Sequence, residues 1–225
     1  FKLTGIGTDA NTGDALTYIW EQMDDNNAAT TNPTTTATTG VAFRSWIPST
    51  DNIRIFPRME DLLANGVNGN AWEKVPTVNR TMNFRFTVRD NKPGGGANES
   101  DNMVVTFTNT RGPLAVTSQN VAGINYPQAS TQTVTWTVNN TNLMTGAANV
   151  NIKLSTDGGY TYPITLVANT PNDGTQTVTI PNVFAPYCRI MVEPTANDFF
   201  AINTANFAIG YAVSQVCNSY TGTPT

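Results

Sequence analysis

The sequence predicts an all-β protein made of two tandem antiparallel β-sandwiches, and three observations lead to this fold class. Apolar and polar residues alternate along 150–155, which gives an extended segment one apolar and one wet face. Turn residues follow at once in Asp157-Gly158-Gly159, where glycine supplies the positive φ of a tight hairpin. Charged residues make up only 12% of the chain, about half the globular norm, which is typical of exposed β proteins rich in Thr and Asn.

The first half of the chain predicts one short helix among strands. The helix is expected at 59–64, MEDLLA, and Gly66 would end it. Trp20 is expected in the core, on the face that it shares with Leu16 and Tyr18. Composition predicts loops at 9–14, at 24–40 and at the glycine-rich stretch 90–102. Strands are expected at 1–7, 15–23, 41–46, 53–56, 81–89 and 103–108.

The second half repeats the β pattern with stronger alternation. Val134, Trp136 and Val138 share one face of a strand, as around the core tryptophan of fibronectin type III-like sandwiches. Further strands are expected around Val116 and at 150–155, 164–167, 178–180, 187–193 and 206–212. We therefore predict an Ig-like sandwich with long insertions at 1–111, a fibronectin III-like sandwich at 112–215 and a linker at 216–225, with Gly112-Pro113 as the hinge.

Composition also bounds the function. The absence of histidine excludes serine and cysteine triads, the HExxH zinc site and imidazole acid-base chemistry. The net charge of −4, without a basic stripe, argues against nucleic acid. The chain contains no run of 18 apolar residues, so no membrane-spanning helix is predicted. Because FKLTGIGT already reads as a strand inside a domain, we expect a processed piece of a longer protein whose first domain lacks its first strand.

Acidic loops predict a calcium site in the first domain. In an Ig-like sandwich the loop 9–14 and the loop 90–102 would lie at the same end. Clustered carboxylates repel one another unless a cation lies among them, and calcium binds six to eight such oxygens. The alternative is that Asp and Asn stand there only because they favour turns. The candidate ligands are Asp9, Asn11, Asp14, Asp90, Glu99 and Asp101.

The two cysteines leave two interpretations open. Cys188 opens one predicted strand and Cys217 follows the last one, so a disulfide is possible if these strands are antiparallel neighbours. Alternatively, Cys188 is a buried thiol and Cys217 pairs outside this segment.

Aromatic and acidic residues raise two further functional hypotheses. Trp46 and Trp72, with Phe43 and Phe56, would stack on sugars if exposed, or fill the core beneath long loops if buried. A carboxylate-pair hydrolase is the other hypothesis, although sixteen acidic residues yield pairs by chance. Its candidate acids are Glu21, Glu60, Glu73, Glu99 and Glu193.

The order of these motifs resembles a known family. GTDANTGDALTYIWEQMD, AFRSWIP, MEDLLANG, WEKVPTVNRTMNFRFTVRDN and DNMVVT resemble an Ig-like module of secreted bacterial zinc metalloproteases of the reprolysin-like kind. ANVNIKLSTDGGYTYPITLVANTPNDGTQTVTIPNV and FFAINTANFAIG resemble the fibronectin-like module that follows it. The resemblance covers roughly residues 1 to 213. Cys188 departs from the family pattern, which has a small residue at that place, so the disulfide gains no support from it.

The resemblance implies a non-catalytic role. The catalytic zinc domain of the family lies upstream, and a P domain or a sorting domain often follows these modules, which fits secretion through the type IX system. Because this chain has no histidine, the family's zinc motif has no counterpart here. We therefore expect an extracellular or cell-surface spacer, stabiliser or binding module, with the catalytic domain and a protein or glycan substrate as partners.

Overall fold

The computed structural model describes residues 1–11, 13–25 and 32–211, and over these residues the fold is all-β with one α-helix, as the sequence predicts. The first elements are β1 (Lys2–Thr4), β2 (Thr17–Gln22), β3 (Ile53–Ile55), α1 (Met59–Asn65), a 3-10 turn (Gly66–Asn68), β4 (Arg80–Arg89) and β5 (Asn98–Phe107). The later ones are β6 (Ala115–Val116), β7 (Asn125–Tyr126), β8 (Thr131–Thr137), a second 3-10 turn (Thr141–Leu143), β9 (Asn149–Ser155), β10 (Ile164–Pro171), β11 (Thr175–Thr179), β12 (Ala185–Pro194), β13 (Ala201–Ile202) and β14 (Phe207–Ile209).

We call the elements β1 to β5, with α1, the N-terminal unit. Its strands form an antiparallel sheet in the order β2-β4-β5 and a two-stranded ribbon of β1 and β3. Met82, Phe84 and Phe86 alternate along β4 with exposed or half-buried residues, so one face of the sheet carries the core. Phe56 packs edge-on against Phe84, with ring centroids 5.1 Å apart, and is fully buried.

The elements β6 to β14 form the C-terminal unit. One sheet has the order β10-β9-β12-β14-β7, with β13 beside β12, and the other has the order β11-β8-β6. The turn at Asn172-Asp173-Gly174 carries the chain from one sheet to the other, because β10 pairs with β9 whereas β11 pairs with β8. Val134 and Trp136 on β8 face Ile152 and Leu154 on β9 across a buried apolar cluster.

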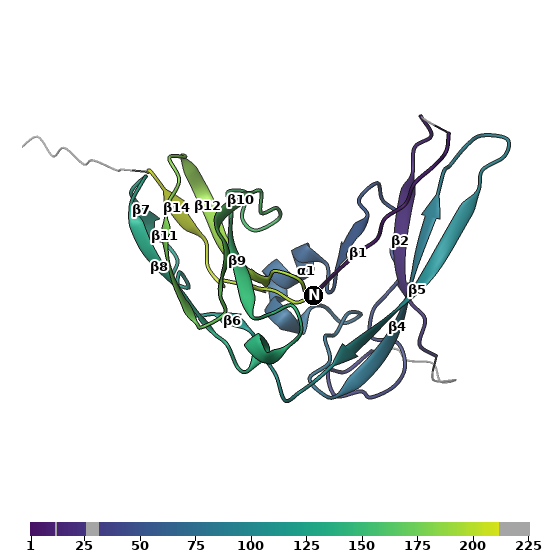
Figure 1. Cartoon of the computed structure of the whole chain (residues 1–225), viewed down its shortest axis with the longest axis horizontal. Coiled ribbons are helices and arrows are strands. Elements are labelled where there is room, and N and C mark those ends of the chain that lie inside the picture. The colour runs from purple at the N-terminus through teal and green to yellow at the C-terminus, as the bar shows by residue number, and fades with distance from the viewer. Residues whose placement is uncertain (12, 26–31, 212–225) are drawn as a thin grey trace, which may run out of the picture.

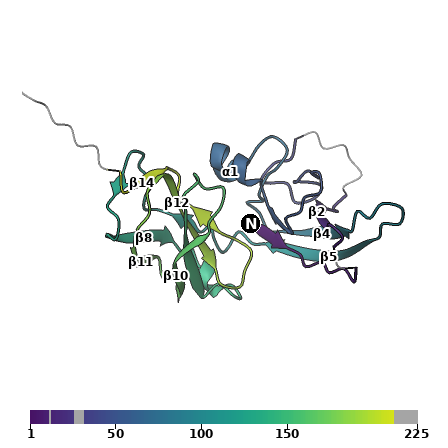
Figure 2. The ribbon, with the colours of Figure 1, turned by 90° about the horizontal axis from the view of Figure 1, so that it is seen from above.

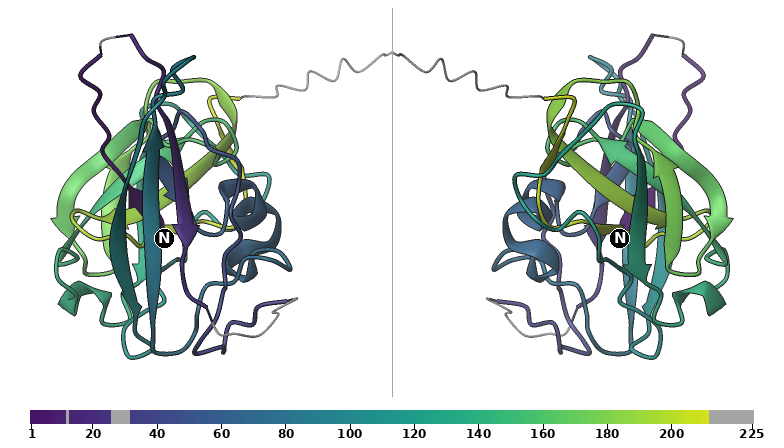
Figure 3. Two further views of the ribbon diagram at one scale, coloured as in Figure 1. Left: turned by 90° about the vertical axis from the view of Figure 1, so that its right-hand side faces the viewer. Right: turned by 90° about the vertical axis from the view of Figure 1, so that its left-hand side faces the viewer.

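The buried apolar residues fall into two separate clusters. One contains residues from Leu3 to Phe86, and the other contains residues from Leu114 to Ile209. The predicted boundary between 111 and 112 falls between them. In Figure 1 the sheets of the two units spread apart in a V shape from the connection between β5 and β6, and α1 and the N-terminus lie between the two units. Seen from above, α1 lies at the same junction (Figure 2), and both views of Figure 3 show it projecting to one side of the strands.

Two predicted elements of the N-terminal unit were wrong, and the sequence analysis also missed a short strand of the C-terminal unit. No strand forms at 41–46, because the N–H groups of Ala42 and Phe43 donate to the Gln22 side chain instead of a neighbouring strand. The loop predicted at 90–102 ends early, since β5 begins at Asn98 and pairs with β4 along its whole length. The short strand β7 was missed, because only two residues pair there.

Candidate functional site

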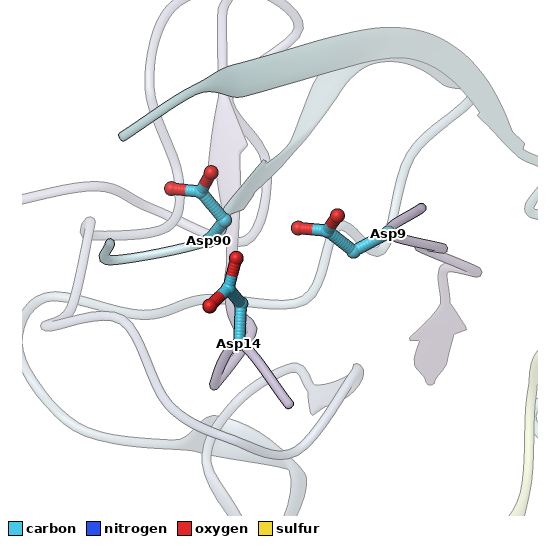
Figure 4. A group of neighbouring side chains, drawn as sticks. All are labelled: Asp9, Asp14 and Asp90. Atoms are coloured by element: carbon cyan, nitrogen blue, oxygen red, sulfur yellow. The ribbon is translucent and has the colours of Figure 1, made fainter. Parts of the chain in front are cut away.

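Three of the predicted calcium ligands converge at one end of the N-terminal unit. Asp9 and Asp14 lie in the loop before β2, and Asp90 follows the last residue of β4. One carboxylate oxygen of each lies within 4.8 Å of the others, and Figure 4 shows the carboxylates of Asp9 and Asp14 directed toward Asp90. Three carboxylates at this spacing repel one another, so a cation among them would be stabilised.

Asp90 is the best fixed of the three carboxylates. It is only 9% exposed, and its Oδ1 accepts hydrogen bonds from the backbone N–H groups of Ala97 and Lys92, at 2.9 and 3.2 Å. These backbone hydrogen bonds hold the pKa of Asp90 below its ordinary value, so the carboxylate is charged. The Lys92 ammonium lies 3.3 Å from Asp14 Oδ2 and neutralises part of the cluster. A calcium ion would therefore compete with Lys92.

The other three predicted ligands do not belong to this group of carboxylates. The N–H of Asn11 donates to Asp9 Oδ1 at 2.7 Å, which makes an Asx turn. Glu99 and Asp101 lie on β5, exposed, opposite Val88 and Phe86 of β4. The sequence placed them in a loop, and the longer β5 removes them from it.

The predicted aromatic residues divide into a buried and an accessible pair. Phe43 and Phe56 are 2% and 0% exposed and belong to the core. Trp72 is 43% exposed and Trp46 is half-buried, so neither ring is fully buried in the core. Arginines stack on both indole rings. The Arg44 guanidinium carbon lies 4.5 Å from the Trp72 centroid, and that of Arg58 lies 3.7 Å from the Trp46 centroid.

Glu73 anchors this region of the N-terminal unit. It is fully buried, and its Oε1 accepts from Trp46 Nε1 at 2.9 Å and from Arg54 Nη2 at 2.8 Å. Its Oε2 accepts from the N–H of Arg58, the residue that precedes α1, at 2.9 Å. One carboxylate therefore fixes the Trp46 ring, a buried guanidinium and the start of α1.

Of the two cysteines, only Cys188 is described. It lies on β12, is fully buried, and forms no disulfide with any described residue. Burial raises the pKa of the Cys188 thiol to about 11, so it is protonated at neutral pH. Cys217 lies outside the described residues, and the predicted pairing stays a prediction.

A buried ion-pair triad, which we call the latch, joins the two units. Glu193 of β12 is 4% exposed and accepts from Lys2 of β1 at 2.5 Å and from Lys153 of β9 at 2.6 Å. Burial raises the pKa of Glu193, but the hydrogen bonds from the two lysines outweigh it and hold that pKa below its ordinary value. The N–H of Lys2 also donates to the carbonyl of Asp198 at 2.8 Å. Of the five acids predicted for a hydrolase, Glu193 and Glu73 are held in buried ion pairs, and Glu60 is in an exposed one with Arg58.

The segment between the units is tied at both ends. The N–H of Asn109 donates to Asn79 of the N-terminal unit at 2.8 Å. Arg111 donates to the Leu143 carbonyl at 2.8 Å, and the N–H of Gly112 donates to the Asn139 carbonyl at 2.7 Å. The connection therefore has partners on both sides rather than running free.

Two adjoining grooves lie along the junction. The first, of about 390 Å³, is lined by β2, β3, the Trp46 loop and the start of α1. The second, of about 440 Å³, lies between α1 and the β9–β10 turn and β12. Glu60 and Tyr160 line both. The sequence did not predict this junction, because its residues come from segments about 100 positions apart. The one signal was a large aromatic residue, Tyr160, directly after the turn at Gly158-Gly159, which the structure shows exposed.

Comparisons with known proteins give no family. No family model matches the chain, and no curated protein matches it. Among the described residues, no helix is long and apolar enough to cross a lipid bilayer.

Proposed function

We propose that this chain is the non-catalytic accessory region of a secreted bacterial zinc metalloprotease, with an Ig-like and a fibronectin III-like sandwich acting as a rigid spacer. The latch is the observation that carries the proposal. Glu193 is buried between a lysine of each unit, and opening is costly because it would take away Lys2, one of the two partners of this buried carboxylate. The tied connection at 109–112 supports the same conclusion. The family itself and the extracellular location rest on the resemblance of motifs.

Small-angle scattering of the 225-residue chain tests the spacer with a matched pair of variants. Lys2 and Lys153 contact the same carboxylate, and their side chains are 29% and 27% exposed. Only the Lys2 contact crosses between the units. We expect Lys2→Ala to broaden the distribution of interatomic distances and Lys153→Ala to leave it unchanged. Scattering of the unmodified chain that requires freely moving units would sink the proposal.

We further propose that calcium stabilises the end of the N-terminal unit at Asp9, Asp14 and Asp90. The three convergent carboxylates support it. With a dissociation constant on the order of 10⁻³ M, calcium at about 10 mM raises the melting temperature by about 4 °C for a chain of this length. Asp9→Ala with Asp90→Ala should remove the rise, whereas Asp101→Ala, an exposed aspartate outside the cluster, should keep it. Identical melting curves in chelator and calcium would show that the acids serve only as turn residues.

Carbohydrate or cell-surface binding is the second candidate function. The exposure of Trp72 and the half-exposure of Trp46 favour it, because an indole face that is accessible can stack on a sugar ring. The arginines over both rings compete for those faces. Loss of glycan binding on Trp72→Ala would identify this surface, and glycan-array silence would exclude it.

A further inference from the structure

The groove between α1 and β12 has two exposed tyrosines in a fixed arrangement. Tyr160 and Tyr187 are each 60% exposed and line this groove from different elements. Their backbones are tied, because the N–H of Gly158 donates to the Tyr187 carbonyl at 2.8 Å and the N–H of Tyr160 donates to Asp157 Oδ1 at 3.0 Å. Two large aromatic side chains are therefore exposed to solvent on backbone segments that hydrogen bonds fix. Exposure of this kind in a hollow of the surface is typical of binding sites.

The β9–β10 turn is itself well fixed by Asp157. Its carboxylate accepts from Ser155 Oγ at 2.6 Å and from Thr161 Oγ1 at 2.6 Å, besides backbone N–H groups. Gly159 has φ of 105° and lies against Leu63 of α1, so a side chain at this position would collide with the helix. The conformation of the turn therefore fixes the position of Tyr160 beside α1.

The polar groups of this groove include both donors and acceptors. Arg189 donates through Nε to Asn206 Oδ1 at 2.7 Å and through Nη1 to the Asn203 carbonyl at 2.8 Å. Among the described residues, its Nη2 and the Asn206 amide nitrogen have no hydrogen-bond partner. Glu60 is half exposed and binds Arg58 through Oε1 at 3.2 Å, which leaves Oε2 to accept. Opposite charges at one rim favour a neutral ligand with hydroxyl groups over an ion.

The elements around the groove are poorly suited to a peptide. An extended peptide gains affinity by adding a strand to a free sheet edge. β12, which carries Tyr187 and Arg189, is hydrogen-bonded on one side to β9 and on the other to β14. α1 is a single short helix with its own backbone hydrogen bonds. A sugar needs no main-chain ladder, because its apolar C–H face packs on an aromatic ring and its hydroxyls reach the planar polar groups.

We propose that the groove between α1 and β12 binds a neutral oligosaccharide, with Tyr160 and Tyr187 as stacking platforms and with Arg189, Asn206 and Glu60 as hydrogen-bonding groups. The first groove continues it past Tyr160 and Glu60, so a chain of several sugars can extend toward Trp46. This proposal deepens the carbohydrate-binding candidate and moves it from Trp72 to the junction. It is independent of the spacer proposal, because the spacer is tested by small-angle scattering in the absence of sugar.

The test is titration of the isotopically labelled 225-residue chain with cellohexaose, chitohexaose, maltohexaose and xylohexaose, followed by nuclear magnetic resonance. We expect at least one sugar to shift resonances of the β9–β10 turn. Tyr160→Ala and Tyr187→Ala should each weaken that binding about three- to tenfold, since each removes one stacking contact. Phe184→Ala is the matched control, because Phe184 is 71% exposed and lines neither groove.

Each alternative result would overturn the proposal. If none of the four sugars shifts any resonance at about 10 mM, binding is excluded even with a millimolar dissociation constant. Binding that survives the double variant Tyr160→Ala with Tyr187→Ala, or that is lost only in Trp72→Ala, places the sugar elsewhere. The chain is finally titrated with a library of extended peptides. Peptides that shift resonances of the β9–β10 turn, when no sugar does, would show that the groove binds polypeptide and not saccharide.

Discussion

Replacing Glu73 by glutamine should destabilise the N-terminal unit far more than the same change at Glu60. Both glutamates pair with an arginine, but Glu73 is fully buried whereas the Glu60 side chain is 49% exposed. Glu73→Gln leaves the Arg54 guanidinium, whose side chain is only 12% exposed, without its counter-ion. It also places an amide N–H₂ against groups that are themselves donors, among them Trp46 Nε1.

The expected magnitude follows from that geometry. Removing one partner of a buried ion pair costs about 3 to 5 kcal/mol, and the remaining amide oxygen still accepts one bond, so we take about 3 kcal/mol. At about 3 °C per kcal/mol for a chain of this length, the melting temperature should fall by about 10 °C. The exposed pair of Glu60 contributes less than about 1 kcal/mol, so Glu60→Gln should lower it by less than about 3 °C.

Tryptophan fluorescence during thermal and urea unfolding measures both variants. Glu73→Gln weakens the acceptor of the Trp46 indole N–H, so the ring should loosen and its emission should shift to longer wavelength in the folded state. Equal shifts of the melting temperature in Glu73→Gln and Glu60→Gln would contradict a stabilising buried ion pair. So would a shift in Glu73→Leu, which keeps the volume but removes every polar atom, no larger than that of a surface substitution.

Three more predictions concern separate parts of the chain. Burial raises the pKa of Asp157, but hydrogen bonds from Ser155 and Thr161 outweigh it and lower that pKa to about 2; its contribution to stability is therefore complete above the unfolded value of about 3.9 and is lost as pH falls toward 2, and Asp157→Asn should flatten the melting temperature over this window. Lys92→Met removes the ammonium that competes for Asp14, so calcium should raise the melting temperature more than in the unmodified chain; an unchanged or smaller rise contradicts competition. Gly5→Ala should cost about 1 to 3 kcal/mol in urea unfolding, because the new methyl would overlap the Phe86 ring; a neutral result would show that the ring moves freely.

Local patterns in the sequence predicted the strands that carry the cores. Met82, Phe84 and Phe86 alternate with polar residues, and the period of two needs no knowledge of the partner strand. The same holds for Val134 and Trp136 on β8. The helix at Met59–Asn65 was also predictable, because Gly66 adopts a φ of 65° directly after it.

Features decided by distant partners were beyond such patterns. β5 begins with the polar run Asn98–Asn102, which has low strand propensity, and its ladder with β4 overrides that propensity. The segment at Phe43 has the sequence pattern of a strand, but its N–H groups donate to the Gln22 side chain and not to a neighbouring strand. The junction of Tyr160 with Glu60 and the latch of Lys2 with Glu193 exist only once the two units meet.

The latch also sets an order of events during synthesis. Lys2 and Glu193 are separated by 191 positions, so their contact cannot form until β12 has been made. At about 5 to 20 residues per second, this delay is about 10 to 40 s after Lys2 is made. The antiparallel β4–β5 hairpin is complete at Phe107, long before then. The edge of the N-terminal unit that faces β12 therefore stays uncovered until β12 has been made, and the latch joins the two units only after that.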